Sequence, residues 1–340
     1  MRVLLLGPER STFVRTDVAG ISHAHSVTVV NTVFGSGVKG ALRMLLTTLR
    51  VIGLLMTHDV LYCWFADYHT LVPTIIARLL RRRVVVVAGG YDVGYLPKIN
   101  YGARMRPLRW FCTRQTFRWA TVVLAVSEYA KRQLQELTGG RHAPVRVVYN
   151  GILADYLPAS IDTVRERLAV TVCQGDSTTE YLRKGLPTFI DVARMIPDVQ
   201  FVIVGPTGAA LALAQRDAAD VPNVTVIPGF VSLKDVIIPL YLRASAYCQF
   251  SIEETFGMVV VESMLCGCVP VTTNGGALPE VGGPQGLRAD TDEGLAQAVK
   301  LAMDRHRHDI DAIVQHARQF SDVRRREEVL AVLNASTVAS

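Results

Sequence analysis

The sequence is 340 residues long, half of its residues are hydrophobic, and its formal net charge at pH 7 is +6. This length fits two ordinary domains, and the many aliphatic side chains exclude a disordered chain. The charge is unevenly divided, because residues 1–150 hold 20 Lys/Arg and 7 Asp/Glu, whereas residues 151–340 hold 16 and 23. We therefore expect separate surfaces with separate partners, the basic half suiting nucleic acid, an anionic membrane or a phosphorylated acceptor.

No segment has the pattern of an export signal or a membrane span. The apolar run after Arg2 has about four residues, fewer than the roughly 7–15 of a signal peptide, and fits a first strand ending at Gly7. The apolar segment from Leu45 to Met56 is interrupted by Arg50 and is shorter than the ~20 residues that cross a bilayer. A cytoplasmic chain is expected, with peripheral contact at the inner face of the membrane left open.

The first half alternates β-branched runs with amphipathic stretches. Ser127 before Glu128 is typical of a helix N-cap with an acidic first turn. Such alternation predicts a parallel sheet with helices on both faces. The predicted strands are Val3–Leu6, Ser26–Val30, Val60–Cys63, Val84–Val87, Val122–Val126 and Val145–Val148, and the predicted helices include Lys39–Met56, Leu71–Arg82 and Ser127–Leu137.

The same alternation resumes after Asn150-Gly151. Three consecutive valines from Val259 favour a strand by propensity, but the segments on either side already supply strands, so a helix over Gly257–Leu265 is predicted. We expect domains at 1–152 and 153–318, followed by a C-terminal segment, 319–340, whose helix Val323–Leu333 could pack back on the first domain. The predicted strands are Ala169–Cys173, Gln200–Val204, Val224–Ile227, Ala246–Phe250 and Val269–Thr272.

The six cysteines form no C-x-x-C pair, and the histidines offer no matching cluster, since His23/His25 and His306/His308 are isolated pairs. Buried reduced thiols are expected, with no metal site and no cofactor.

The segment from Ser251 to Val271 contains the largest group of candidate binding residues. Read as strand, loop, helix and strand, it places Gly257 at the helix start, where a ligand can approach the backbone. The amides of Phe256, Gly257 and Met258, with the helix dipole behind them, would then bind a phosphate. A carboxylate can accept from two hydroxyls at once, so Glu254 suits a sugar and Glu262 a ribose.

This segment resembles the family-4 retaining glycosyltransferases (glycosyltransferase group 1). Glu254 and Glu262 are seven residues apart, as in the family's E-x7-E motif, and the Phe-Gly before and the Gly-x-Pro-Val after match its context. The resemblance covers residues 84–285. It implies an α/β protein of the GT-B fold, with two doubly wound Rossmann-like domains facing across a cleft.

Further segments resemble the same family in the same order. Tyr181–Gly185 is similar to its Lys-Gly phosphate clamp, which implies that Lys184 stabilises the leaving diphosphate. The alternative is a solvated basic pair. Arg183 could replace an arginine that the family carries upstream and this chain lacks. The segment ending at Gly205 resembles the strand that ends at the family's donor site, and the segment ending at Val231 resembles the family's loop that lines the nucleobase.

In the first domain, a loop with catalytic potential follows the strand Val84–Val87. It contains Gly90, Tyr91 and Asp92, where many family members carry a histidine, and Asp92 could bind donor or acceptor hydroxyls. Gly90 could equally be part of a plain turn. His69 is a weaker acceptor-side candidate with a structural alternative, and Gly7 gives a substrate room at the first strand's end.

Two basic concentrations lie in the first half. Cations interleaved with aromatic rings suit an anionic bilayer interface, and the alternative is an ordinary surface helix whose rings face the core. No RNA-binding motif accompanies them, so nucleic acid is not expected. They comprise Arg78, Arg81, Arg82 and Arg83, and then Arg104, Arg106, Arg109, Arg114 and Arg118 with Trp110, Phe111, Phe117 and Trp119.

These features predict a retaining glycosyltransferase. It would move a sugar from a nucleotide-diphosphate-sugar to a glycan or lipid-linked acceptor, in cell-surface polysaccharide or glycolipid synthesis. We expect Glu254, Lys184 and Asp92 to be catalytic and no metal to take part. Two alternatives stay open: a nucleotide-sugar epimerase of the same architecture, and a non-catalytic module that binds a membrane or polyanion.

Overall fold

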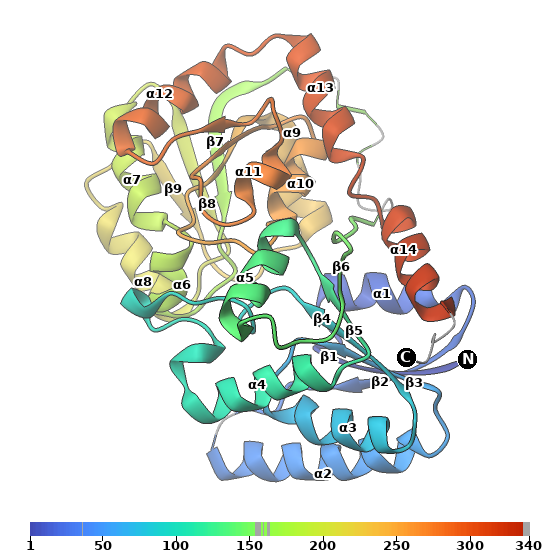
Figure 1. Cartoon of the computed structure of the whole chain (residues 1–340). Helices are drawn as coiled ribbons and strands as arrows, with labels where there is room; N and C mark the ends of the chain where they lie inside the picture. The colour runs from blue at the N-terminus through green and yellow to red at the C-terminus, as the bar shows by residue number, and fades with distance from the viewer. Residues whose placement is uncertain (36, 154–157, 159, 162–163, 336–340) are drawn as a thin grey trace. The chain divides into compact units, whose positions relative to one another are not determined.

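The computed structural model describes residues 1–35, 37–153, 158, 160–161 and 164–335 (Figure 1). They form two compact units, one of Met1–Gly151 together with the chain from Ser321 onward, the other of Ile152–Phe320. The predicted domain limits, after residues 152 and 318, lie close to the observed unit limits, after Gly151 and Phe320. Residues 336–340 of the predicted C-terminal segment lie outside the described residues.

The first unit is built on a parallel sheet of six strands in the order β2-β1-β3-β4-β5-β6. Figure 1 shows helices α2, α3 and α4 on one side of this sheet and α1 and α14 on the other. With both faces covered, the central strands are apolar, as Val84–Val87 illustrates with four fully buried valines. The strands are β1 (Arg2–Gly7), β2 (Ser26–Asn31), β3 (Val60–Trp64), β4 (Arg83–Ala88), β5 (Val122–Ala125) and β6 (Val145–Val147).

The helices of this unit confirm the predicted positions, with one correction. The Ser127 hydroxyl caps α5 by accepting from the Ala130 amide, as expected. The predicted helix Leu71–Arg82 begins earlier and ends earlier, because the Asp67 side chain caps its start and Arg81 takes a left-handed conformation (φ 56°). The helices are α1 (Thr12–Ser22), α2 (Gly37–Leu55), α3 (Tyr68–Leu79), α4 (Pro107–Trp119), α5 (Glu128–Thr138) and α14 (Asp322–Asn334), with short 3-10 turns at Pro97–Ile99 and Ala103–Met105.

The second unit contains another six-stranded parallel sheet, in the order β12-β11-β10-β7-β8-β9. Its valine-rich segment forms helix α10, as predicted. Among the described strands of this unit, only the short β12 was not predicted from the sequence. The strands are β7 (Glu166–Val172), β8 (Gln200–Val204), β9 (Val224–Ile227), β10 (Ala244–Gln249), β11 (Val269–Thr272) and β12 (Leu287–Arg288). The helices are α6 (Thr178–Arg183), α7 (Leu186–Met195), α8 (Gly208–Asp217), α9 (Ile238–Arg243) preceded by a π turn at Leu233–Ile237, α10 (Met258–Leu265), α11 (Leu278–Gly282), α12 (Asp292–Met303) and α13 (Arg307–Ala317).

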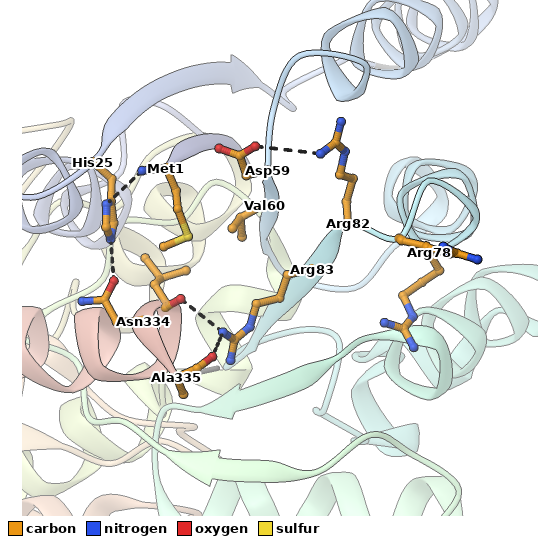
Figure 2. A pocket seen from close by; sticks show the side chains of 11 residues that line it. Met1, His25, Asp59, Val60, Arg78, Arg82, Arg83, Asn334 and Ala335 are labelled. Atoms are coloured by element: carbon orange, nitrogen blue, oxygen red, sulfur yellow. Dashed lines mark hydrogen bonds and ion pairs between the residues drawn. The ribbon is translucent and has the colours of Figure 1, made fainter. Parts of the chain in front are cut away.

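Within the first unit, a buried ion pair joins the C-terminal helix α14 to helix α1. The guanidinium of Arg325 donates to both carboxylate oxygens of Asp17, at 2.6 and 2.9 Å, and also to the carbonyls of Val148 and Tyr149. At the other end of α14, Arg83 donates to the carbonyls of Leu333 and Ala335 (Figure 2). Because this cation satisfies the last carbonyls of the helix, Arg83 stabilises the end of α14.

All six cysteines are buried and free, as expected. None of the helices in the described ranges is long and apolar enough to cross a membrane.

Candidate functional site

Two loops of the second unit, about seventy residues apart in sequence, lie against each other at the carboxyl edge of its sheet. One ends helix α6 with Arg183, Lys184 and Gly185, and the other follows β10. The Ile252 amide donates to the Arg183 carbonyl (2.9 Å), and the Arg183 guanidinium donates to the Glu253 carbonyl (3.2 Å). Gly185 has φ +69°, and a Cβ there would overlap the Phe250 carbonyl. Only glycine allows this approach.

This contact brings Lys184 and Glu254 together. Glu254 is buried, and its Oε1 accepts from Lys184 Nζ (2.6 Å), Ser251 Oγ (3.1 Å) and Gln249 Nε2 (3.3 Å). Burial alone would raise the pKa of the Glu254 carboxyl, but the charges of Lys184 and Arg183, with these hydrogen bonds, hold the pKa below its usual value. Glu254 is therefore an ionised carboxylate that fixes the position of the Lys184 ammonium.

Arg183 lies beside this pair and is held by acids of its own unit. Its Nη2 is 2.8 Å from Glu180 Oε2, and its Nη1 is 3.6 Å from Glu254 Oε1. The predicted donor-binding cation is thus present at the same edge of the sheet as Lys184, with most of its surface covered.

Helix α10 begins beyond this loop, at Met258. Gly257 precedes it in a left-handed conformation (φ 91°, ψ 61°), and no side chain caps the helix. The first-turn N–H groups of a helix have no intrahelical acceptor, so this end suits an anion. Phe256 is a buried anchor whose ring packs edge-on against Phe320, with the ring centroids 5.4 Å apart. Its side chain therefore holds the loop in place.

Glu262 differs electrostatically from Glu254. It is half-buried on α10, and burial raises the pKa of its carboxyl to about 7. Within the described ranges no Lys, Arg or His forms an ion pair with it. A carboxyl group without a cation suits the uncharged hydroxyls of a ribose.

The Asn274–Gly276 loop closes over the backbone of Glu254. The Ala277 amide donates to the Glu254 carbonyl (2.7 Å), and Gly276 has φ +69° with no room for a Cβ against that same carbonyl. Beside this loop lies a pocket of about 450 Å³ that the sequence analysis did not foresee. It is lined by Thr188, Phe250, Ser251, Ile252, Thr273, Asn274, Gly275, Asp290, Asp292 and Leu295.

The remaining donor-side candidates lie at the same carboxyl edge. Gly205 directly follows β8 with φ +95°, and its amide donates to the Ile227 carbonyl. In the loop after β9, Val231 is half-buried and Phe230 is 83% exposed. Phe230 therefore offers an open aromatic face beside the predicted Val231.

The acceptor-side candidates meet in a pocket of about 310 Å³ in the first unit. His69, Tyr91 and Asp92 line it, and Gly7 and Gly90 are the chain neighbours of lining residues. The pocket lies where β1, β3 and β4 end. Its full lining is Pro8, Thr32, Phe65, Ala66, Asp67, His69, Tyr91, Asp92 and Arg109.

Asp92 is 1% exposed and connects two of these strand ends. Its carboxylate accepts from the amides of Ala66 (3.2 Å), Gly89 (3.3 Å) and Gly90 (3.0 Å). Burial raises its pKa to about 6, against the lowering effect of these hydrogen bonds. Asp92 thus has a structural function that the sequence did not reveal, and its catalytic role stays a prediction.

His69 brings an imidazole ring to this pocket. Its Nε2 is buried and has no hydrogen-bond partner among the described residues. Burial lowers the pKa of the imidazole to about 4, so His69 is neutral near pH 7. A neutral imidazole can either donate to or accept from a substrate hydroxyl.

Arg109 and Asp67 form one wall of the pocket, a position that neither sequence-based interpretation of the basic stretch gave to Arg109. Its Nε and Nη2 donate to the two Asp67 oxygens at 2.7 and 2.8 Å, and its guanidinium stacks on Tyr91 at 4.7 Å from the ring centroid. Phe117, from the same stretch, is fully buried because it faces the core. Phe111 and Trp119 are exposed.

The described residues contain no group of three or more His, Cys, Asp or Glu placed to hold a metal ion. Metal-free catalysis stays a prediction.

Two family models match the chain. "Glycosyltransferase Family 4" matches residues 1–156, and "Glycosyl transferases group 1" matches residues 180–319. A D-inositol 3-phosphate glycosyltransferase of Mycolicibacterium vanbaalenii is 27% identical over 51% of this chain and 42% of its own length. The gpi3 subunit of a phosphatidylinositol N-acetylglucosaminyltransferase of Schizosaccharomyces pombe is 29% identical over 40% of this chain and 30% of its own. The matches thus span less than half of these curated relatives.

Solved structures match over nearly the whole chain. Anabaena HepE, in complex with UDP and glucose, is 18% identical with a TM-score of 0.74, covering 98% of this chain and 100% of its own. Sucrose-phosphate synthase of Thermosynechococcus elongatus is 12% identical with a TM-score of 0.75, covering 98% of both chains. These likenesses confirm the predicted GT-B fold. The chain belongs to the group 1, family 4 glycosyltransferases, which confirms the sequence-based assignment to this enzyme class.

Proposed function

We propose that this chain is a retaining glycosyltransferase that transfers a sugar from a nucleotide-diphosphate-sugar to a glycan or lipid-linked acceptor. The observation that carries the proposal is the Lys184–Glu254 pair at the carboxyl edge of the second sheet. Glu254 is close in sequence to Gly257, where helix α10 starts without a side-chain cap. A fixed cation and a helix N-terminus are the features that stabilise a diphosphate. We further propose that the pathway is cell-surface polysaccharide or glycolipid synthesis.

In the proposed reaction the second unit binds the donor. Lys184 faces the diphosphate, and Glu262 accepts hydrogen bonds from the ribose hydroxyls. As the bond between the anomeric carbon and the phosphate oxygen breaks, negative charge grows on the diphosphate. The Lys184 ammonium, held in place by Glu254, stabilises this charge without having to reorganise.

The acceptor is assigned to the first unit, to the pocket lined by His69, Tyr91 and Asp92. Its hydroxyl oxygen forms a bond to the anomeric carbon on the face from which the phosphate departs. A phosphate oxygen takes the hydroxyl proton, so the nucleoside diphosphate leaves with that proton and the configuration is retained. The proposal requires no metal and no cofactor.

HepE forms a complex with UDP and glucose, so UDP-sugars are the first donors to test. A thermal-shift screen of UDP, GDP, ADP and dTDP identifies the nucleotide, because a ligand that binds only the folded state raises its melting temperature. Incubation with the matching nucleotide-sugar and a panel of glycan and lipid-linked acceptors then measures transfer. Formation of an epimer from donor alone would instead establish an epimerase, and a chain that neither binds nor turns over any donor would be a non-catalytic module.

The proposal includes peripheral association with an anionic membrane, where a lipid-linked acceptor would be presented. The excess of basic residues in the first half supports it.

A further inference from the structure

Helix α2 (Gly37–Leu55) packs against its unit through few of its side chains. Of its 19 residues, only Gly40, Val51 and Leu55 are buried. In Figure 1 it lies at the outside of the helical layer, with α3 between it and the sheet. A helix usually gains most of its stability by burying its apolar stripe, so the exposed side of α2 requires another explanation.

The exposed side of α2 is apolar. Val38 is 87% exposed, and Leu42, Leu45, Leu46 and Leu49 are each 55–57% exposed. Residues at these spacings, three or four apart, form one continuous face of an α-helix. Scattered exposed leucines need no explanation, but a contiguous row of five marks an interaction surface.

Three cations accompany this face: Lys39, Arg43 and Arg50. All three are exposed, and the sequence contains no Asp or Glu between residues 37 and 58. Exposed leucines also occur on α3, which packs against α2, and on α4: Leu79 is 70% exposed and Leu108 is 67% exposed.

We propose that the face of α2 formed by Val38, Leu42, Leu45, Leu46 and Leu49 is the docking surface for an anionic lipid bilayer. A helix with leucines on one face, cations beside them and no acid lies in the plane of the interface, its apolar face among the acyl chains and its cations at the lipid phosphates. A second copy of this chain fits poorly, because pairing two such faces would bring their cations together. The inference rests on the proposed peripheral association and does not depend on sugar transfer.

The test is co-sedimentation of the full chain with vesicles of phosphatidylcholine alone or with an equal amount of phosphatidylglycerol. We expect binding to the anionic vesicles that weakens with added salt. The variant Leu45→Glu/Leu46→Glu should lower the partition coefficient at least tenfold. Both side chains are exposed, so the fold should persist. Lys39→Ala should lower binding about fivefold on anionic vesicles and leave binding to neutral ones unchanged.

The matched control is Leu301→Glu, which places the same charge at a 50% exposed position of α12 in the second unit. It should bind vesicles as the wild type does. Circular dichroism checks folding, and Leu45→Gln/Leu49→Gln serves as the milder variant if the double glutamate variant unfolds. Equal binding by the wild type and a folded α2 variant would overturn the inference, as would a dimer that binds no vesicles and dissociates in that variant. Vesicle binding without sugar transfer would contradict only the proposed function.

Discussion

The Lys184 ammonium lies 2.6 Å from Glu254 Oε1, although the two residues are 70 positions apart in sequence. Their side chains are 17% and 9% exposed, so water screens this pair little. The carboxylate, itself held by Ser251 and Gln249, determines where the cation points. The first glutamate of the motif therefore positions the lysine in this structure, in addition to the sugar contact predicted for it.

We predict that Lys184→Ala lowers kcat about 10²–10³-fold, the effect of removing one group that stabilises charge in a transition state. The same change leaves the Glu254 carboxylate buried without its main partner, which should cost about 3 kcal/mol of the free energy of unfolding. Steady-state kinetics and urea denaturation measure the two effects.

A double variant separates the effect on turnover from the effect on stability. Lys184→Met/Glu254→Gln removes both charges while keeping amide hydrogen bonds to Ser251 and Gln249, so it should recover most of the lost stability and none of the turnover. Wild-type turnover in either variant would exclude Lys184 from the reaction.

Glu262 provides a prediction on pH. Its pKa is raised from 4.5 to about 7 by burial, so the folded chain holds a proton that the unfolded chain releases. The free energy of unfolding contributed by this group is therefore fully present below pH 4.5 and is lost as the pH rises toward 7. Glu262→Gln cannot titrate, so its melting temperature should fall less than that of the wild type over this range.

The same residue should affect nucleotide binding. An ionised carboxylate accepts hydrogen bonds from hydroxyls more strongly than a protonated one, so affinity should rise between pH 6 and pH 8. Calorimetry of the wild type should show this rise, and Glu262→Gln should show weaker binding with little dependence on pH. A variant that binds the nucleotide as tightly as the wild type at pH 8 would exclude Glu262 from the ribose site.

The fold could be predicted from the sequence because its signals are local. Continuous apolar runs such as Val84–Val87 and caps such as Ser127 depend on near neighbours, and all eleven predicted strands are present. The helix over Met258–Leu265 required topology to override the strand propensity of its valines. β12 has only two residues, too few for periodicity to reveal.

Less of the site could be predicted from the sequence, because the site is formed by contacts between residues that lie far apart in the sequence. Motif spacing identified Glu254 and Lys184 but gave no sign that they pair with each other. In the sequence Arg109 resembles any other basic residue of its stretch, but in the structure two of its guanidinium nitrogens donate to Asp67, 42 positions away. A possible signal was the aspartate at the N-cap position before α3, at the end of a buried strand.

Gly276 is predicted to be irreplaceable because Glu254 lies directly against it. Gly276→Ala would combine a left-handed φ of +69° with an overlap on the Glu254 carbonyl. We expect a loss of about 2–3 kcal/mol in the free energy of unfolding, together with a smaller melting-temperature rise on nucleotide addition. The control is Gly139→Ala, whose φ is +60° and whose Cβ would meet nothing within 4 Å. It should lose only about 1 kcal/mol, the strain of the backbone alone. Equal losses in both variants would refute the packing argument.

His69 provides a prediction that separates a structural role from a functional one. Its buried Nε2 has no partner among the described residues, and such an atom normally costs stability. His69→Phe replaces the ring with an apolar one beside Phe34 and should leave the free energy of unfolding equal or higher. If the imidazole binds an acceptor hydroxyl, the same variant should raise the acceptor KM about tenfold, while the donor nucleotide still shifts the melting temperature as in the wild type. Because the pKa of His69 is about 4, its contribution should not vary between pH 6 and pH 8. Loss of stability with an unchanged acceptor KM would instead show that His69 serves only the fold.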